Sequence, residues 1–244
     1  MGSPLVRLKP ASHRKCSLIC VPCAGGSPGQ FLNLARALPG TIEVLAADPD
    51  GARNSICGND ALINFSKHVS DEIIAHGCSC VSLLGYSIGA KICYEIAKCL
   101  EKKESVKLRH LFVVGSSPPS PKLPDSVGDK DYHEMLEDLY GAIGLTAEDE
   151  EVRVEVARRL TRDLSWNAKY TADETTKIQI SITEIHGKND PSYMINTGAK
   201  WSDFTSAETT SHRLGGGHLV LKHNESAIAR LIISKIYGGS VSVK

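Results

Sequence analysis

The segment CVSLLGYSIGAKICYEIAKCL, residues 80–100, constrains the fold more than any other part of the sequence. Residues 80–85 form an apolar run typical of a buried strand. From Ile88 to Leu100, apolar residues recur every three or four positions, which predicts an amphipathic helix. The residues between them have the form G-x-S-x-G, a sharp strand-to-helix turn that exposes a nucleophilic serine. Ser87 is therefore the candidate nucleophile; the alternative is that residues 85–89 form only a tight turn.

The sequence on both sides of this segment alternates short apolar runs with amphipathic patterns. Besides residues 80–85 and 88–100, it predicts strands at 17–21, 42–47, 110–115, 178–187 and 208–214, and helices at 31–38, 62–76 and 225–237. Such alternation is typical of βαβ units. We therefore expect an α/β fold with a mostly parallel sheet flanked by helices.

Residues 118–177 interrupt this alternation. The segment begins with a proline-rich stretch and continues with helical patterns at 132–143 and 147–163, the second preceded by Thr146 as a candidate N-cap. We expect one α/β core made of residues 1–117 and 178–244, with 118–177 as a helical insertion. The alternative is a linker.

The composition argues against several classes of function. Lys plus Arg and Asp plus Glu each total 28, and aromatic residues are only 5%, so neither a basic surface nor a base-stacking surface for nucleic acid is indicated. No run approaches the roughly 18–20 apolar residues of a membrane-spanning helix, and residues 1–10 lack the apolar core of a secretory signal. Gly2 would suit N-myristoylation, but Val6 stands where that motif requires Ser or Thr. We expect a cytoplasmic protein that binds neither nucleic acid nor membranes.

Eight cysteines are many for a cytoplasmic chain of 244 residues. Most lie in apolar runs, where a cysteine packs as a small hydrophobic residue. Cys20-Val21-Pro22-Cys23 has the C-x-x-C form of thiol–disulfide catalysts, but Gly25-Gly26 is a poor start for the helix that would lower the thiol pKa. A zinc site that joined this pair to Cys78 and Cys80 would have to form in or beside buried strands. We expect structural cysteines, no metal and no cofactor.

A serine nucleophile needs a base that takes its proton, and the base needs a group that orients it. On a strand–turn–helix scaffold of this kind the partners follow in the order Ser, acid, His. Asp190 comes just past the apolar run 178–187, at the carboxyl end of a strand, where open α/β sheets place functional groups. His218 follows three glycines after the last expected strand. We predict Ser87 as nucleophile, His218 as base and Asp190 as acid.

Each of these assignments has a simpler alternative. Asp190 precedes Pro191 and could serve only in an Asx turn. His218 could be an ordinary loop histidine, with His212 and His223 as the nearest competitors.

Attack on a carbonyl group creates an oxyanion that two backbone N–H groups must stabilise. One comes from the residue after the nucleophile, here Ile88, and the other from the loop after an early strand. The string PCAGGS at residues 22–27 follows the strand 17–21, and Ala24 is the first choice for the second donor, with Gly25 next. The alternative is an ordinary glycine-rich turn.

These strings together resemble the type II thioesterases of polyketide, nonribosomal-peptide and fatty-acid synthesis, which are α/β hydrolases. The resemblance covers nearly the whole chain. It rests on PCAGGS at 22–27 for the family's PHAGGS, GYSIGA at 85–90 for GHSxGA, Arg162-Asp163 and Tyr170 at the end of the family's helical lid, and GGGHL at 215–219 for its GGHF segment. The sequence departs from the family at Cys23, at Tyr86 and at residues 48–53.

Tyr86 also resembles the integrated, type I thioesterase domains of nonribosomal synthetases, which often carry Gly-Tyr-Ser. Those domains place the acid after the strand that follows the nucleophile helix. Here that strand ends in Val114-Gly115-Ser116-Ser117, which contains no carboxylate. The acid role therefore falls to Asp190, as in the type II group.

The resemblance implies a serine thioesterase that hydrolyses acyl thioesters from the phosphopantetheine arm of an acyl or peptidyl carrier protein, in editing or product release. It also implies an acyl-enzyme intermediate and a moving lid formed by residues 118–177. We expect a monomer. Two other classes of function stay open: a serine hydrolase of free esters or amides, and a noncatalytic module that binds acyl carriers.

Overall fold

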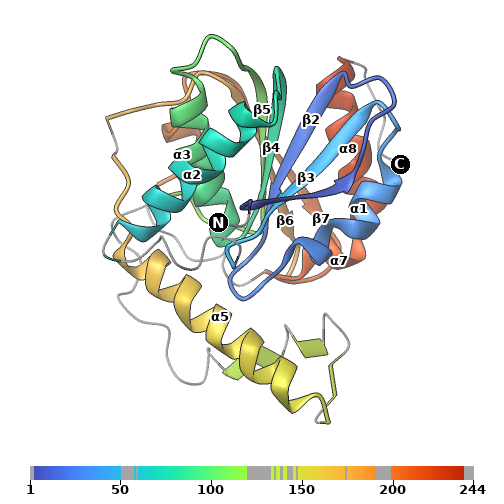
Figure 1. Ribbon diagram of the computed structural model, residues 1–244, viewed down its shortest axis with the longest axis vertical. Helices are drawn as coiled ribbons and strands as arrows, with labels where there is room; N and C mark the ends of the chain where they lie inside the picture. The colour runs from blue at the N-terminus through green and yellow to red at the C-terminus, as the bar shows by residue number, and fades with distance from the viewer. Residues whose placement is uncertain are drawn as a thin grey trace.

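A sheet of seven strands runs through the centre of the molecule (Figure 1). The computed structural model describes residues 3–50, 58, 60–119, 133–134, 136–137, 140–141, 145–146, 148–173, 175–190 and 199–238. The strands are β1 (Leu5–Lys9), β2 (Cys16–Val21), β3 (Ile42–Ala47), β4 (Cys80–Tyr86), β5 (Lys107–Val114), β6 (Ser181–Gly187) and β7 (Thr209–Leu214). Their order in the sheet is β1-β3-β2-β4-β5-β6-β7, and every neighbouring pair is parallel except β1 with β3.

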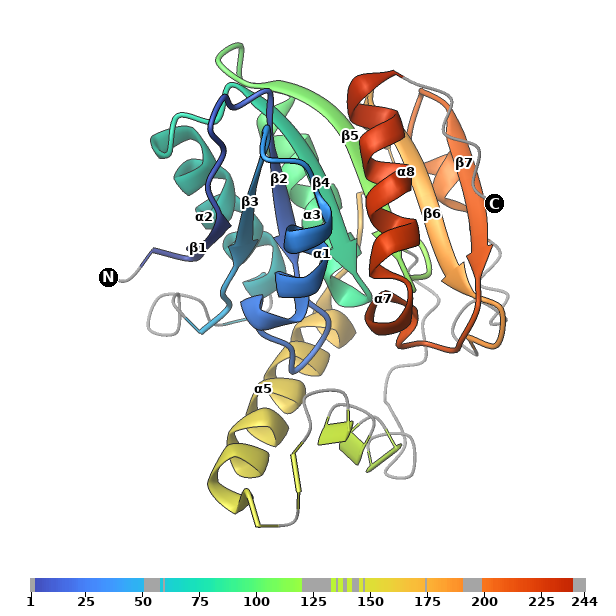
Figure 2. The ribbon, with the colours of Figure 1, turned by 90° about the vertical axis from the view of Figure 1, so that its right-hand side faces the viewer.

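Helices cover both faces of the sheet. Helices α2 (Ala61–Ala75) and α3 (Ile88–Leu100) lie on one face, and α1 (Leu32–Ala37) and α8 (Glu225–Tyr237) on the other (Figures 1 and 2). All residues of β2 and β3 are buried, as expected for parallel strands covered on both sides. The prediction of an α/β fold with a mostly parallel, helix-flanked sheet is confirmed.

The predicted strands and the four predicted helices of the core lie within three residues of their expected bounds. The sequence did not predict β1, nor the short elements η1 (Pro28–Phe31), η2 (Trp201–Asp203) and α7 (Val220–His223). Strand β1 is an antiparallel edge strand with no fully buried residue, so it lacks the apolar run that marks the inner strands.

Helix α5 (Glu150–Lys169) lies outside these two layers, beyond one end of the sheet (Figures 1 and 2). It starts later and ends later than the expected helix 147–163. The N-cap prediction for Thr146 is wrong: Asp149 takes the cap position, and the Thr146 backbone N–H donates to its carboxylate at 2.7 Å. Half of the expected helix 132–143, and most of the proline-rich stretch before it, lie outside the described residues; residues 133–134, 136–137 and 140–141 are helical.

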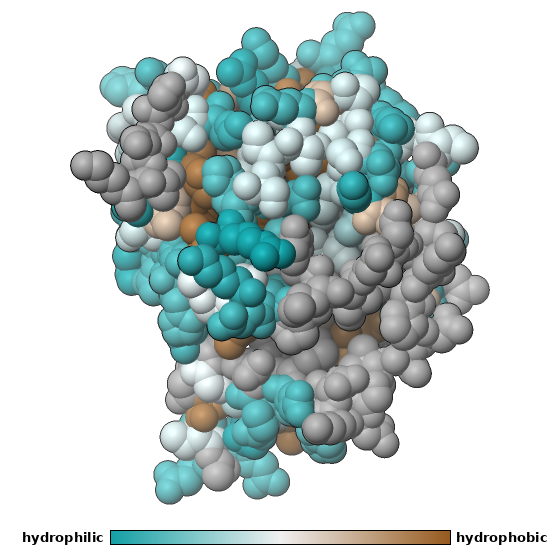
Figure 3. Space-filling view, turned by 180° about the vertical axis from the view of Figure 1, so that it is seen from behind, coloured by the Kyte–Doolittle hydropathy of each residue, from teal (hydrophilic) through white to brown (hydrophobic). Residues whose placement is uncertain are grey.

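Hydrophilic and intermediate side chains cover most of the described surface seen from behind, with apolar side chains in small areas between them (Figure 3). Among the residues that the structure describes, no helix combines the length and the apolar character needed to cross a membrane.

Candidate active site

Ser87 occupies a strained turn between β4 and α3. Its φ of 55° and ψ of −123° make it the only non-glycine residue with positive φ in the described part of the chain. Such a conformation costs of order 1–3 kcal/mol and persists only where the surroundings impose it. A Cβ on Gly85 would lie 2.3 Å from the Ala90 Cα, and a Cβ on Gly89 would lie 2.2 Å from the Val21 carbonyl oxygen. Both glycines of the motif are therefore required, and the partly exposed serine stands on the strand-to-helix turn that the sequence predicts.

Asp190 and His218 contact each other at the same edge of the sheet. The His218 Nδ1 lies 3.2 Å from both carboxylate oxygens of Asp190. The Asp190 side chain is completely buried, whereas that of His218 is 30% exposed. Asp190 therefore does more than close a turn; the residues from Pro191 that would complete an Asx turn lie outside the described residues. The competing His212 lies within β7 and His223 at the end of α7.

The loops that carry Asp190 and His218 are packed tightly against each other. The backbone N–H of Asn189 donates to the Gly216 carbonyl at 3.0 Å. A Cβ on Gly187 would lie 2.1 Å from the Gly217 carbonyl oxygen, so only glycine allows this approach. The acid and the histidine are thus held by backbone contacts as well as by their own hydrogen bond.

Tyr86 is a further residue of the site that the sequence marked only as a departure from the family pattern. Its hydroxyl donates to the His218 backbone carbonyl at 2.9 Å, and its ring stacks on the imidazole with centroids 6.0 Å apart. Gly115 lies beside these residues: a Cβ there would be 3.4 Å from an atom of Tyr86, of His218 and of Asp190. The only local signal for this role was its position next to Ser87.

The loop after β2 leaves the sheet at this same edge, because β2 runs parallel to β4 beside it. The turn at residues 23–26 is closed by a 3.0 Å hydrogen bond between its first and last residues, and Gly25 has a φ of 72°. The Gly25 N–H donates to the Asp163 carboxylate of α5 at 2.9 Å, so this donor already has a partner. Ala24 is the candidate that remains in this loop. Ile88 is the first residue of α3, and the first N–H groups of a helix have no partner within it.

Asp163, which the sequence marked only as part of the family's lid string, brings a carboxylate to this loop. It is only 3% exposed, and the Arg162 Nε lies 2.7 Å from its other oxygen. Burial raises the pKa of the Asp163 carboxyl, while hydrogen bonds from Arg162 and from the Gly25 N–H oppose that rise.

The cysteine alternatives do not fit the structure. Cys20 and Cys23 are buried and not linked, and burial raises the pKa of both thiols, that of Cys23 to about 11. A thiol–disulfide catalyst needs an accessible thiolate, so this role is disfavoured. Cys20 pairs with Leu84, four residues along β4 from Cys80, so the two cysteine pairs of the zinc alternative lie at opposite ends of the strands. Cys57 lies outside the described residues.

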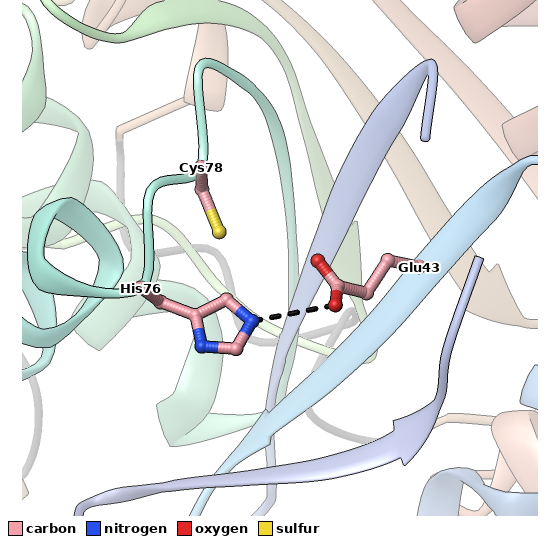
Figure 4. A group of neighbouring side chains, drawn as sticks. All are labelled: Glu43, His76 and Cys78. Carbon is pink, nitrogen blue, oxygen red and sulfur yellow. Dashed lines mark hydrogen bonds and ion pairs between the residues drawn. The ribbon is translucent and has the colours of Figure 1, made fainter. Parts of the chain in front are cut away.

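Glu43, His76 and Cys78 have the spacing of metal ligands among the described residues (Figure 4). The Glu43 carboxylate also lies 3.2 Å from the Arg7 Nε and 3.0 Å from an Arg14 nitrogen. Two guanidinium groups already neutralise this carboxylate, and a metal ion would have to displace them. Burial also raises the pKa of the Cys78 thiol. We interpret the group as an ion-pair cluster that joins β1, β3 and the end of α2.

A family model described as a thioesterase domain matches residues 16–236. The chain belongs to the thioesterase domain family. Among relatives of this thioesterase chain, the gramicidin S biosynthesis protein GrsT of Aneurinibacillus migulanus is 29% identical over 86% of this chain and 84% of GrsT. Thioesterase PikA5 of Streptomyces venezuelae is 24% identical over 88% of this chain and 79% of PikA5.

A solved structure supports the same assignment. The type II thioesterase BorB from the borrelidin biosynthetic cluster superposes with a TM-score of 0.79 at 26% identity, covering 95% of this chain and 97% of BorB. The predicted family and the predicted α/β-hydrolase fold of this thioesterase are confirmed.

Proposed function

We propose that the protein is a serine thioesterase that hydrolyses acyl groups from the phosphopantetheine arm of an acyl or peptidyl carrier protein, using Ser87, His218 and Asp190. The observation that carries the proposal is the contact between His218 and Asp190 at the sheet edge where Ser87 stands on its strained turn. Membership of the thioesterase family supports the reaction type.

The geometry supports a two-step reaction. With Nδ1 oriented by Asp190, the Nε2 of His218 accepts the Ser87 proton while Oγ attacks the thioester carbonyl. The N–H groups of Ala24 and Ile88 stabilise the oxyanion. The C–S bond then breaks, the thiol leaves with the proton from His218, and Ser87 is acylated. A water molecule gives its proton to His218, attacks the acyl-serine, and the free acid and the Ser87 hydroxyl are formed.

We extend the proposal to the domain division, with residues 1–117 and 178–244 as core and 118–177 as a lid over the acyl chain. The described part of this insertion supports it, since α5 contacts the loop after β2 through Asp163. A lid that moves in its earlier part, while the end of α5 stays bonded to the core, would control access to the serine.

A carrier protein as partner is supported by the names of GrsT and BorB, which connect them with the biosynthesis of gramicidin S and of borrelidin. Editing and product release both fit this reaction. Monomeric state and cytoplasmic location remain predictions from the sequence.

The test is hydrolysis of a hexanoyl-loaded carrier protein, followed by the mass of the intact carrier. We expect wild type to release hexanoate and free carrier thiol, and Ser87→Ala to lose at least about 10³-fold in rate. Ser211→Ala, on the exposed side of β7, is the matched control and should retain activity. Binding of the loaded carrier without turnover would favour the noncatalytic module, and preference for free hexanoyl esters would favour the other hydrolase class.

A further inference from the structure

The last turns of α5 are hydrogen-bonded to the core through side chains three or four residues apart. Three bonds form this polar seam: the Gly25 N–H donates to Asp163 at 2.9 Å, Lys91 donates to Asn167 at 2.8 Å, and Tyr170 donates to Glu95 at 2.7 Å. Lys91 and Glu95 are buried and follow Ser87 at one-turn intervals along α3. The end of α5 is therefore fixed to the nucleophile helix and to the loop after β2.

The Asp163 bond differs from the other two because its partner is backbone. The N–H groups of Ala24 and Gly25 belong to consecutive peptide groups that share the Ala24 Cα. Fixing the Gly25 N–H therefore restricts the direction of the Ala24 N–H. Gly25, with a φ of 72° in this turn, has more conformational freedom than other residues. A hydrogen bond to a group outside the loop therefore restricts the backbone strongly at this position.

The negative charge of the Asp163 carboxylate is balanced by the neighbouring Arg162. A lone carboxylate next to a developing oxyanion would repel it, but the Arg162 Nε lies 2.7 Å from the other Asp163 oxygen. The same guanidinium donates to Asp50 at 2.5 Å. A carboxylate acceptor gives a stronger hydrogen bond than a neutral one, and the paired arginine offsets its charge.

We infer that Asp163 is a positioning residue of the oxyanion hole: its bond to the Gly25 N–H holds the Ala24 N–H in the direction that the oxyanion requires. The inference rests on the proposed function. It assigns the end of α5 to the fixed frame of the site and makes Ala24, rather than Gly25, the donor from this loop.

The test compares Asp163→Ala with Tyr170→Phe, which removes one bond of the same seam without contacting the loop; Glu95 keeps Lys98 at 2.9 Å. The substrate is the hexanoyl thioester of N-acetylcysteamine. The inhibitor is a hexyl trifluoromethyl ketone, whose carbonyl carbon is attacked by the Ser87 Oγ to form a tetrahedral adduct with an oxyanion. For Asp163→Ala we expect kcat to fall at least about tenfold, KM to change less than about threefold, and ketone affinity to weaken in parallel with kcat. Tyr170→Phe should change each quantity less than about threefold.

Asp163→Asn keeps an oxygen acceptor, so its kcat and ketone affinity should both lie between wild type and Asp163→Ala; this variant replaces the alanine if that protein does not fold. Equal behaviour of Asp163→Ala and Tyr170→Phe would overturn the inference, as would a loss of kcat with unchanged ketone affinity. If instead the ketone does not bond to Ser87 in wild type, the proposed function itself fails.

Discussion

The Tyr86 hydroxyl and the His218 carbonyl, 132 positions apart in the sequence, form a 2.9 Å hydrogen bond. This bond links the residue before the candidate nucleophile to the backbone of the candidate base. Because the Tyr86 ring also stacks on the imidazole, one side chain restrains both the backbone and the ring of His218.

Tyr86→Phe removes the hydroxyl and keeps the stacking ring. The lost hydrogen bond should lower the free energy of unfolding by about 1 kcal/mol and kcat by about three- to tenfold, because His218 is held less firmly. Urea unfolding and steady-state kinetics measure both. Tyr237→Phe, at the exposed end of α8, also removes a hydroxyl hydrogen bond, the one to Thr41, but away from the site, so it is the control for kcat. Unchanged kcat in Tyr86→Phe would show that this bond does not position His218.

Gly89→Ala should destabilise the protein, because its Cβ would lie 2.2 Å from the Val21 carbonyl oxygen. Overpacking of this kind typically costs about 1–3 kcal/mol, and backbone at such a short distance places the expected loss at the upper end. Gly141→Ala is the matched control, since a Cβ there meets nothing within 4 Å. Equal unfolding midpoints of the two variants in urea would contradict the close packing of α3 against β2.

Lys91 makes stability depend on pH. Burial lowers the pKa of Lys91 to about 8 from its ordinary value of 10.5. Between these values the unfolded chain binds a proton at Lys91 that the folded protein does not, so the Lys91 contribution to the free energy of unfolding should rise with pH from about 8 to about 10. Buried cysteines such as Cys20 and Cys23, whose pKa is raised, contribute a fall in the same range, so the Lys91 contribution is read as the difference between wild type and a Lys91 variant. Lys91→Met should remove this contribution, so that its free energy of unfolding falls relative to wild type as pH increases, and Lys103→Met, at an exposed position, should keep the wild-type pH dependence. Urea titrations at pH 7.5, 8.5 and 9.5 give the free energy of unfolding of each protein. If this free energy changes with pH in the same way in wild type and in Lys91→Met, the lowered pKa of Lys91 is refuted.

Asp190→Asn keeps the shape of the side chain and removes its charge. Loss of the carboxylate that orients His218 should lower kcat by about 10²–10⁴-fold and change the pH–rate profile. Asp71→Asn, on the exposed side of α2, controls for the loss of one charge. If turnover and the pH–rate profile stay as in wild type, a carboxylate other than Asp190 orients the base.

The inner strands and the turn at Ser87 could be predicted because their determinants are local. A strand covered on both faces has to be apolar along its length, as β2 and β3 are, and the strained serine needs glycines at fixed positions on both sides. Strand β1 escaped prediction because an edge strand needs no such run. The N-cap prediction for Thr146 was wrong because the helix begins only at Glu150, so that Asp149 takes the cap position.

The contacts that complete the site join distant parts of the chain. Asp163 and Gly25 are 138 positions apart, and nothing near either residue indicates the other. Asp190 and His218 could be proposed from the order of strands, but their 3.2 Å contact depends on the packing of the loops after β6 and β7. The sequence marked Tyr86 by its place next to Ser87, but it did not predict that the Tyr86 hydroxyl bonds to the His218 carbonyl.

The most direct test of the central claim is to locate the acyl group during turnover. Wild-type protein is mixed with hexanoyl-loaded carrier protein, quenched in acid within milliseconds to seconds, digested and mapped by mass spectrometry. The account predicts one hexanoyl addition on the peptide that contains Ser87, decaying as hexanoate is released and absent from Ser87→Ala. Hydrolysis without any adduct on Ser87, or an adduct on another residue, would contradict it.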